Sequence, residues 1–129
     1  MIGFRVENEV ERNMDKNNNL KARLEYNNDA VFIKELSKSQ ESIMEICDSM
    51  KDLLLYKNEK YGDSALHPNN IFYKGDSTNS IKIRLDDKIG RIKNCEQTRI
   101  NDVADVIGYC VLLLISIGAC KEDIEKLKD

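Results

Sequence analysis

The amino-acid sequence predicts an all-α protein built as a bundle of three to four main helices. The 129-residue chain has a single proline and is rich in Glu, Lys, Leu and Ile, a composition that favours helices. Apolar residues recur at intervals of three and four along three long segments, which is the period of one helix face. A chain of this length suffices for one domain with a hydrophobic core.

Residues 1–30 differ in composition from the rest of the chain. The opening MIGFRV is compatible with a short strand or a docked arm, and the segment after it is rich in Asn and in charged residues. So few apolar residues cannot bury enough surface to order the segment by itself. We therefore expect an N-terminal arm over residues 1–30, flexible or docked on a partner, and a helical domain over residues 31–129.

The first helix is expected over about residues 37–60. Its apolar side chains share one stripe that is expected to face the core: Ile43, Ile46, Cys47, Met50, Leu53 and Leu54. Four carboxylates fall on the far side of the helix and form an acidic stripe: Glu41, Glu45, Asp48 and Asp52. This acidic stripe is expected in solvent, unless a neighbouring subunit covers it.

A loop of some twenty residues follows the first helix and contains the only histidine, His67. Its Gly, Pro and Asn residues are typical of turns. A loop of that length in a compact domain is usually functional or flexible. His67 contacts a substrate or has no catalytic role.

The second helix is expected over about residues 80–94, with one apolar and one charged face. The apolar face carries Ile81, Leu85, Ile89 and Ile92, and the charged face carries Arg84, Asp87, Lys88 and Arg91. Three cations on one face suit phosphate groups, because Arg offers paired donors to them. The alternative is a solvated face with an ordinary Asp87–Arg91 ion pair.

The third helix is expected over about residues 99–117, with Asn101 as N-cap and Gly118 as its stop. It is apolar nearly all round, which is typical of a helix enclosed by others. The exception is a narrow polar stripe formed by Asp102, Asp105, Tyr109 and Ser116. The two aspartates either hold a cation such as Mg²⁺ or are stabilised by the positive end of the helix.

The connection between the second and third helices is short, since it consists of residues 95–99. A short connection predicts an antiparallel helical hairpin. In such a hairpin the cationic face of the second helix can meet Asp102 and Asp105.

Composition narrows the class of partner. The net charge of −3 argues against a nucleic-acid duplex, which demands a basic face. Four cysteines without a CxxC motif read as free thiols in a reducing cytosol. The N-terminus lacks the apolar segment of a signal peptide, and the apolar run over residues 106–120 is shorter than the ~20 residues that span a bilayer. We therefore expect a cytoplasmic protein that does not enter the membrane.

Three separated segments resemble known families. The stretch NDVADVIGYCVLLL resembles the second signature of MazG-like nucleoside triphosphate pyrophosphohydrolases, with Asp102 and Asp105 at the positions of its acidic pair. More closely, LLLYKNEKYGDSA, then IKIRLDDKIGRIKN and then the Asp-x-x-Asp helix resemble the nucleotide modification associated domain type 1, a small helical family of phages and prophages. The resemblance covers about residues 50–118.

The resemblance implies a nucleotide site and its residues. Asp87, Asp102 and Asp105 would hold Mg²⁺ and serve catalysis. The residues expected to bind substrate are Arg84, Lys88, Arg91, Lys60, Tyr61 and Tyr109. The chain departs from the MazG-like EExxE signature, because the aligned residues 87–91 read DKIGR and carry only one acid. A register shifted by one recovers Asp86 and Asp87 but places Gly90 at the third acidic position. Either Glu41, Glu45 or Asp48 of the first helix replaces the missing ligands, or Lys88 and Arg91 bind the phosphates directly.

Two functions remain open from the sequence, beside a purely structural role as a small helical oligomer whose charges form a solvated surface. The first is a Mg²⁺-dependent (deoxy)nucleoside triphosphate pyrophosphohydrolase that acts on the nucleotide pool or in nucleotide modification, within the bacterial host if the protein is phage-encoded. The second is a non-catalytic protein that sequesters a nucleotide or a nucleotide signal, which the departure from EExxE favours. In both cases we expect a homodimer or homotetramer, because three helices leave the acidic stripe and the arm without partners.

Overall fold

The computed structural model describes residues 35–72 and 74–128, and these contain four α-helices and one short 3-10 helix but no strand. The all-α class predicted from the sequence is thereby confirmed for this part of the chain. The chain divides into two units, Met1–Glu41 and Ser42–Asp129, and the second unit holds the candidate site described below. The arm expected over residues 1–30 lies outside the described residues.

The three long helices lie close to the expected ranges. They are α2 (Lys38–Tyr61), α3 (Ser77–Asn94) and α4 (Ile100–Ser116). The charged tail contains α5 (Lys121–Glu125) and a 3-10 turn over Lys126–Lys128.

Helix α3 begins three residues earlier than the expected Ser80, and Asp76 is the reason. Its carboxylate accepts a hydrogen bond of 2.8 Å from the backbone N–H of Asn79 and so caps the first turn. Asp is among the best N-cap residues, because it satisfies an amide that the helix leaves unpaired.

Helix α4 begins and ends with different kinds of cap. Its N-cap is Arg99 rather than the expected Asn101, and no side chain caps it. At the other end Gly118 adopts φ +81°, and its N–H donates to the carbonyl of Ile115 while that of Ala119 donates to Leu114. This pair of bonds is a Schellman motif, so the predicted glycine stop is confirmed.

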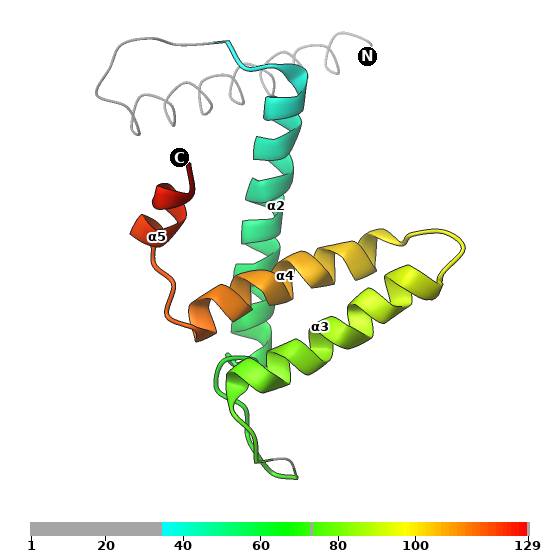
Figure 1. The fold of residues 1–129 in the computed structure, drawn as a ribbon, viewed down its shortest axis with the longest axis vertical. Helices are drawn as coiled ribbons and strands as arrows, with labels where there is room; N and C mark the ends of the chain where they lie inside the picture. Colours follow the sequence, from blue (N-terminus) through cyan, green and yellow to red (C-terminus); the bar gives the residue numbers. More distant parts are fainter. Residues whose placement is uncertain (1–34, 73, 129) are drawn as a thin grey trace, which may run out of the picture. The chain divides into compact units, whose positions relative to one another are not determined.

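Helices α3 and α4 pack antiparallel as a hairpin, as the short connection predicts (Figure 1). Lys88 pairs with Asp105 in the middle of the hairpin, and Thr78 donates to the Ser116 hydroxyl at 3.0 Å near its open end. Within the described ranges, the buried apolar side chains are Ile81 and Leu85, and both lie on α3.

The hairpin approaches the C-terminal half of α2 through α4 (Figure 1). Gly108 is buried at this crossing, and a Cβ added there would lie 2.9 Å from the Cδ2 of Leu54. The missing side chain therefore sets how closely the two helices approach.

Burial differs from expectation on α2 and α4. Helix α4 was expected to be enclosed, but Val103 and Ile107 are each 39% exposed. The apolar stripe of α2 was expected in the core, but Ile43 and Ile46 are each 61% exposed. Among the described residues, α3 packs along one side of α4 and α2 meets it at Gly108, so the other sides of α4 and the start of α2 stay uncovered.

Within the described ranges, no single helix is both long and apolar enough to cross a membrane; α4 meets the criteria only together with Lys121–Lys128, after a bend of 116°.

Candidate functional site

A cavity of about 750 Å³ lies between α2, α4, the start of α3 and the loop over residues 62–72. Its wall is mostly apolar, with Leu54, Ile81 and Leu112 contributed by the three helices. Polar side chains also line it, among them Lys57, Arg84 and Asp105. A concave, mainly apolar site with a few placed polar groups is the usual form of a small-molecule pocket, and this volume falls within its usual range.

The loop that borders the cavity leaves α2 through a Schellman motif. The N–H of Gly62 donates to the carbonyl of Glu59, and the N–H of Asp63 donates to that of Asn58. Both Gly62 and Asp63 adopt left-handed backbone angles, with φ values of 63° and 60°. The strain at Asp63 is offset by side-chain bonds, because its carboxylate accepts from Asn58 and contacts His67, each at 2.7 Å.

These contacts favour the charged form of Asp63. The hydrogen bond from Asn58, and then that from His67, hold the pKa of the Asp63 carboxyl below its usual range. His67 itself does not line the cavity and is 78% exposed, so its visible role is to brace the loop. Tyr61 and Asp63 do line the cavity, so the helix stop is also the lip of the pocket.

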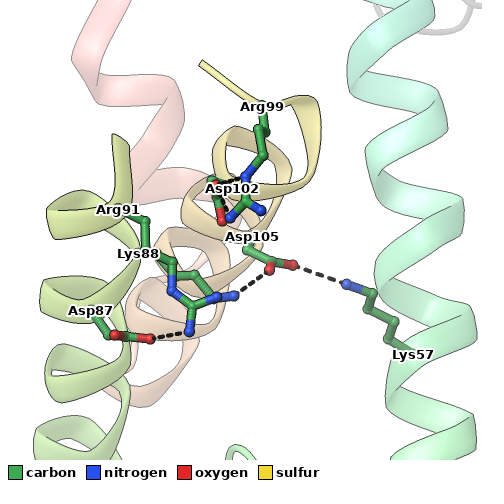
Figure 2. Close-up of polar contacts among 7 residues, drawn as sticks. All are labelled: Lys57, Asp87, Lys88, Arg91, Arg99, Asp102 and Asp105. Atoms are coloured by element: carbon green, nitrogen blue, oxygen red, sulfur yellow. Dashed lines mark hydrogen bonds and ion pairs between the residues drawn. The ribbon is translucent and has the colours of Figure 1, made fainter. Parts of the chain in front are cut away.

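Asp105 lines the cavity, and its carboxylate lies between Lys57 and Lys88 (Figure 2). Its Oδ2 lies 2.8 Å from the Nζ of Lys88 on α3, and its Oδ1 lies 3.1 Å from the Nζ of Lys57 on α2. One carboxylate thus connects all three long helices. The sequence-based expectation that a cation of α3 faces Asp105 is met by Lys88.

The two lysines keep Asp105 ionised at neutral pH. Partial burial by itself would raise the pKa of the Asp105 carboxyl, but the hydrogen bonds from Lys88 and Lys57 outweigh it and lower the pKa. Two positive charges share one negative charge, so this cluster keeps a net positive charge beside the cavity.

Arg84 adds a third cation to the same site. It lines the cavity one turn before Lys88, and among the described residues it makes no ion pair. A guanidinium without a carboxylate partner at the edge of an apolar pocket can accept a bidentate anion such as a phosphate. The described site therefore favours an anionic ligand.

Asp102 has a different environment from Asp105. It is only 2% exposed and accepts from the Nε and Nη2 of Arg99, both at 2.8 Å to its Oδ2. It does not line the cavity. Arg99 is the helix N-cap, so the pair closes the first turn of α4, where a carboxylate also benefits from the helix dipole.

The remaining predicted site residues divide into two groups. Asp87 and Arg91 pair with each other at 3.2 Å on the outside of α3, with side chains 59% and 50% exposed. Lys60 lies over the ring of Tyr56 at 5.7 Å and stays outside the cavity. Tyr109 lines the cavity, as do Tyr61, Arg84 and Asp105.

The carboxylates do not assemble a magnesium site in the described residues. No three His, Cys, Asp or Glu side chains there lie together in a way that could hold a metal ion. Asp87, Asp102 and Asp105 each pair with a cation instead, and no member of the acidic stripe lines the cavity. Mg²⁺ usually takes one or two carboxylates together with water and phosphate oxygens, and here the cations occupy those carboxylates.

Two polar residues of the site were missed at the level of sequence. Lys57 continues the apolar stripe of α2 at a spacing of seven from Met50, and a cation on an apolar face signals a partner. Asn58 gave no such signal, because its role depends on the left-handed turn that follows the helix.

Comparison with known proteins adds no relative: no family model matches the chain, and no curated protein and no solved structure is detectably similar to it.

Proposed function

We propose that the cavity binds a nucleotide or a closely similar phosphorylated aromatic molecule, without a metal ion held by the described chain. The observation that carries the proposal is Arg84, a cavity-lining guanidinium that has no ion pair among the described residues. The Lys57–Asp105–Lys88 cluster lies on the same side and adds net positive charge. Phosphate oxygens are the anions that such a set of donors fits best.

The apolar part of the cavity supports an aromatic group on the ligand. Tyr61 and Tyr109 both line it, together with Met50 and Pro68. A nucleobase can stack on a tyrosine ring while the apolar wall excludes water from its faces. The ligand would then place its base toward the loop and its phosphates toward Arg84.

The sequestering function is therefore the one that the geometry supports best. Hydrolysis assisted by Mg²⁺ would need carboxylates that are free to bind the metal, and the three candidate aspartates are paired with cations. The resemblance to the nucleotide modification associated domain type 1 suggests that the bound molecule belongs to the nucleotide pool.

The test is a binding titration with nucleoside mono-, di- and triphosphates, with inorganic phosphate as a reference, in EDTA and in Mg²⁺. We expect binding that persists in EDTA and that is stronger for nucleotides than for phosphate alone. Arg84→Met should weaken it about 10- to 100-fold, since a hydrogen bond to a charged group contributes about 1.5–3 kcal/mol. Lys82→Met is the matched control, because Lys82 is exposed on the same helix outside the cavity.

Three results would contradict the proposal. Absence of binding by any nucleotide would remove the ligand class. Equal losses in Arg84→Met and Lys82→Met would show that the effect is general charge rather than the cavity. Release of pyrophosphate that requires Mg²⁺ and is lost in Asp105→Asn would replace sequestration by pyrophosphohydrolysis.

A further inference from the structure

The loop side of the cavity carries a negative charge. Of the described loop residues that line the cavity, Asp63 alone has a charged side chain. The other charged groups of the wall lie on the helices, where the cations Lys57 and Arg84 stand against the single carboxylate of Asp105. The loop side and the helix side therefore differ in charge. A ligand that suits both needs an anionic part and a part that donates hydrogen bonds.

The carboxylate of Asp63 lies across the rim of the cavity. Its Oδ1 accepts a hydrogen bond of 2.7 Å from the side-chain amide of Asn58. Asn58 lines the cavity and shares one face of α2 with Leu54 and Tyr61, which line it as well. The Oδ2 of Asp63 lies 2.7 Å from the Nδ1 of His67, which does not line the cavity and is 78% exposed. One oxygen is thus held on the cavity side and the other toward solvent.

Asp63 can still accept hydrogen bonds from a ligand. An ionised carboxylate has about four lone-pair sites on its two oxygens and no donor. The contacts with Asn58 and His67 use one site on each oxygen, so each oxygen can accept a further bond. The hydrogen bond from Asn58, and then that from His67, lower the pKa of the Asp63 carboxyl, so the group remains a pure acceptor at neutral pH. Within the described ranges, no lysine or arginine pairs with Asp63.

Two neighbouring acceptors discriminate between nucleobases by their hydrogen-bonding edges. Guanine presents two adjacent donors, N1–H and the N2 amino group, which can meet the two oxygens of one carboxylate. Adenine and cytosine present one amino group beside a ring nitrogen that is itself an acceptor. Uracil and thymine present one N–H between two carbonyls. With any base other than guanine, an acceptor of the base would face an acceptor of the protein, and both would lose a hydrogen bond on binding.

We propose that the bound nucleotide carries guanine and that Asp63 selects the base. This inference rests on the proposed nucleotide site and names the base that the site takes. The N1 and N2 edge of guanine lies toward Asp63, and the phosphates lie toward Arg84 on the helix side. The charge of Asp63 also repels phosphates from the loop side, so the nucleotide binds in one orientation.

The test compares nucleoside monophosphates by calorimetric titration of the full-length protein in EDTA. Inosine monophosphate lacks the 2-amino group of guanine, and xanthosine monophosphate has a carbonyl in its place. We expect guanosine monophosphate to bind about tenfold more tightly than inosine monophosphate, which is the low end for a hydrogen bond to a charged group because Asp63 is 40% exposed. Xanthosine monophosphate should bind more weakly still, because its carbonyl faces the carboxylate. The adenosine, cytidine and uridine monophosphates should also bind more weakly than guanosine monophosphate.

Asp63→Asn changes the chemistry of the rim and keeps the turn. Asn tolerates the left-handed φ of 60° and retains an acceptor for Asn58. Its amide N–H can donate to the carbonyl of xanthine, so the variant should bind xanthosine monophosphate about tenfold more tightly than guanosine monophosphate. A residue that only shapes the loop would not produce such a gain. His67→Ala is the matched control, because it removes a brace of the loop, leaves the carboxylate and should keep the preference for guanine.

Equal affinity for the three purine monophosphates of the test would overturn the inference. An Asp63→Asn variant that still prefers guanine would also overturn it, as would an equal loss of preference in His67→Ala and Asp63→Asn. If Arg84→Met nevertheless weakens every nucleotide, the proposed nucleotide site stands and only the choice of base is wrong. Absence of binding by every nucleotide would remove both the site and the base.

Discussion

The ion pair between Lys88 and Asp105 should contribute more to stability than a surface ion pair. Its atoms are 2.8 Å apart, and its side chains are only 19% and 24% exposed. Exposed pairs contribute about 0.2–1 kcal/mol, whereas removing one partner of a buried pair costs about 3–5 kcal/mol. Because this pair is partly buried, we expect a coupling free energy of about 1–2 kcal/mol between the two side chains.

The measurement is a double-mutant cycle with Lys88→Met, Asp105→Asn and the double variant. Urea unfolding followed by helical circular dichroism gives each free energy of unfolding, at one fixed protein concentration because association also changes stability. Met keeps the apolar stem of Lys88, and Asn keeps an acceptor for Lys57, so the cycle isolates the charge pair.

The pair between Asp87 and Arg91 is the matched control. It lies on the same helix, but its side chains are 59% and 50% exposed. A pair four residues apart on an exposed helix face contributes about 0.3–0.5 kcal/mol. A Lys88–Asp105 coupling no larger than this would refute the reasoning, because it would mean that the hairpin does not shield the pair from water.

Four further outcomes follow from the structure. Asp105→Asn should tighten nucleotide binding about threefold, since a unit charge about 6 Å from a phosphate in water costs about 0.7 kcal/mol; weaker binding in a titration would contradict the proposed charge balance. The free energy of unfolding should fall below about pH 4, because the pKa of Asp105 is lowered in the folded state and its ion pairs are lost as pH drops through that lowered value. Urea unfolding at several pH values measures this fall, and Asp105→Asn should make it smaller. Gly118→Ala should lower the free energy of unfolding by about 1 kcal/mol, because φ is +81° at this position. Gly90→Ala should raise the free energy of unfolding by up to about 1 kcal/mol, because Gly90 lies in a helix interior with open space around it. Melting temperatures that shift in the same direction in both variants would contradict this backbone argument. Asp76→Ala should cost about 1 kcal/mol through loss of the α3 cap, and an unchanged unfolding midpoint would show that the cap does not hold that turn.

Helix positions were largely predictable because they depend on neighbours in the chain. The apolar period located α2, α3 and α4, and Gly118 marked the end of α4 before any packing was known. The error at the start of α3 arose from a local signal that was overlooked, the Asp76 cap. The error at Asn101 had another cause, since the N-cap of α4 lies two residues earlier, at Arg99, which makes no side-chain cap that a sequence pattern could reveal.

The candidate site was predictable only in part. The facing of Lys88 and Asp105 followed from the hairpin, because antiparallel helices joined by a short loop bring such faces together. Asp102 and Asp105 were expected to act together, but they have different partners. Asp102 pairs with Arg99, which is not part of the polar stripe of α4, so the stripe did not indicate this contact. Lys57 is 48 residues from Asp105 in the chain, so no local pattern joined them.

The sequence by itself determined that this protein is helical, where its long helices run and which face of each is charged. Those properties depend on propensity, period and caps, which act over a few residues. Tertiary structure decided which carboxylate meets which cation and which tyrosines line the cavity, because side-chain partners are set by how helices cross. It also showed that many apolar side chains of α2 and α4 are exposed in the described part of the chain, which a count of apolar residues does not reveal.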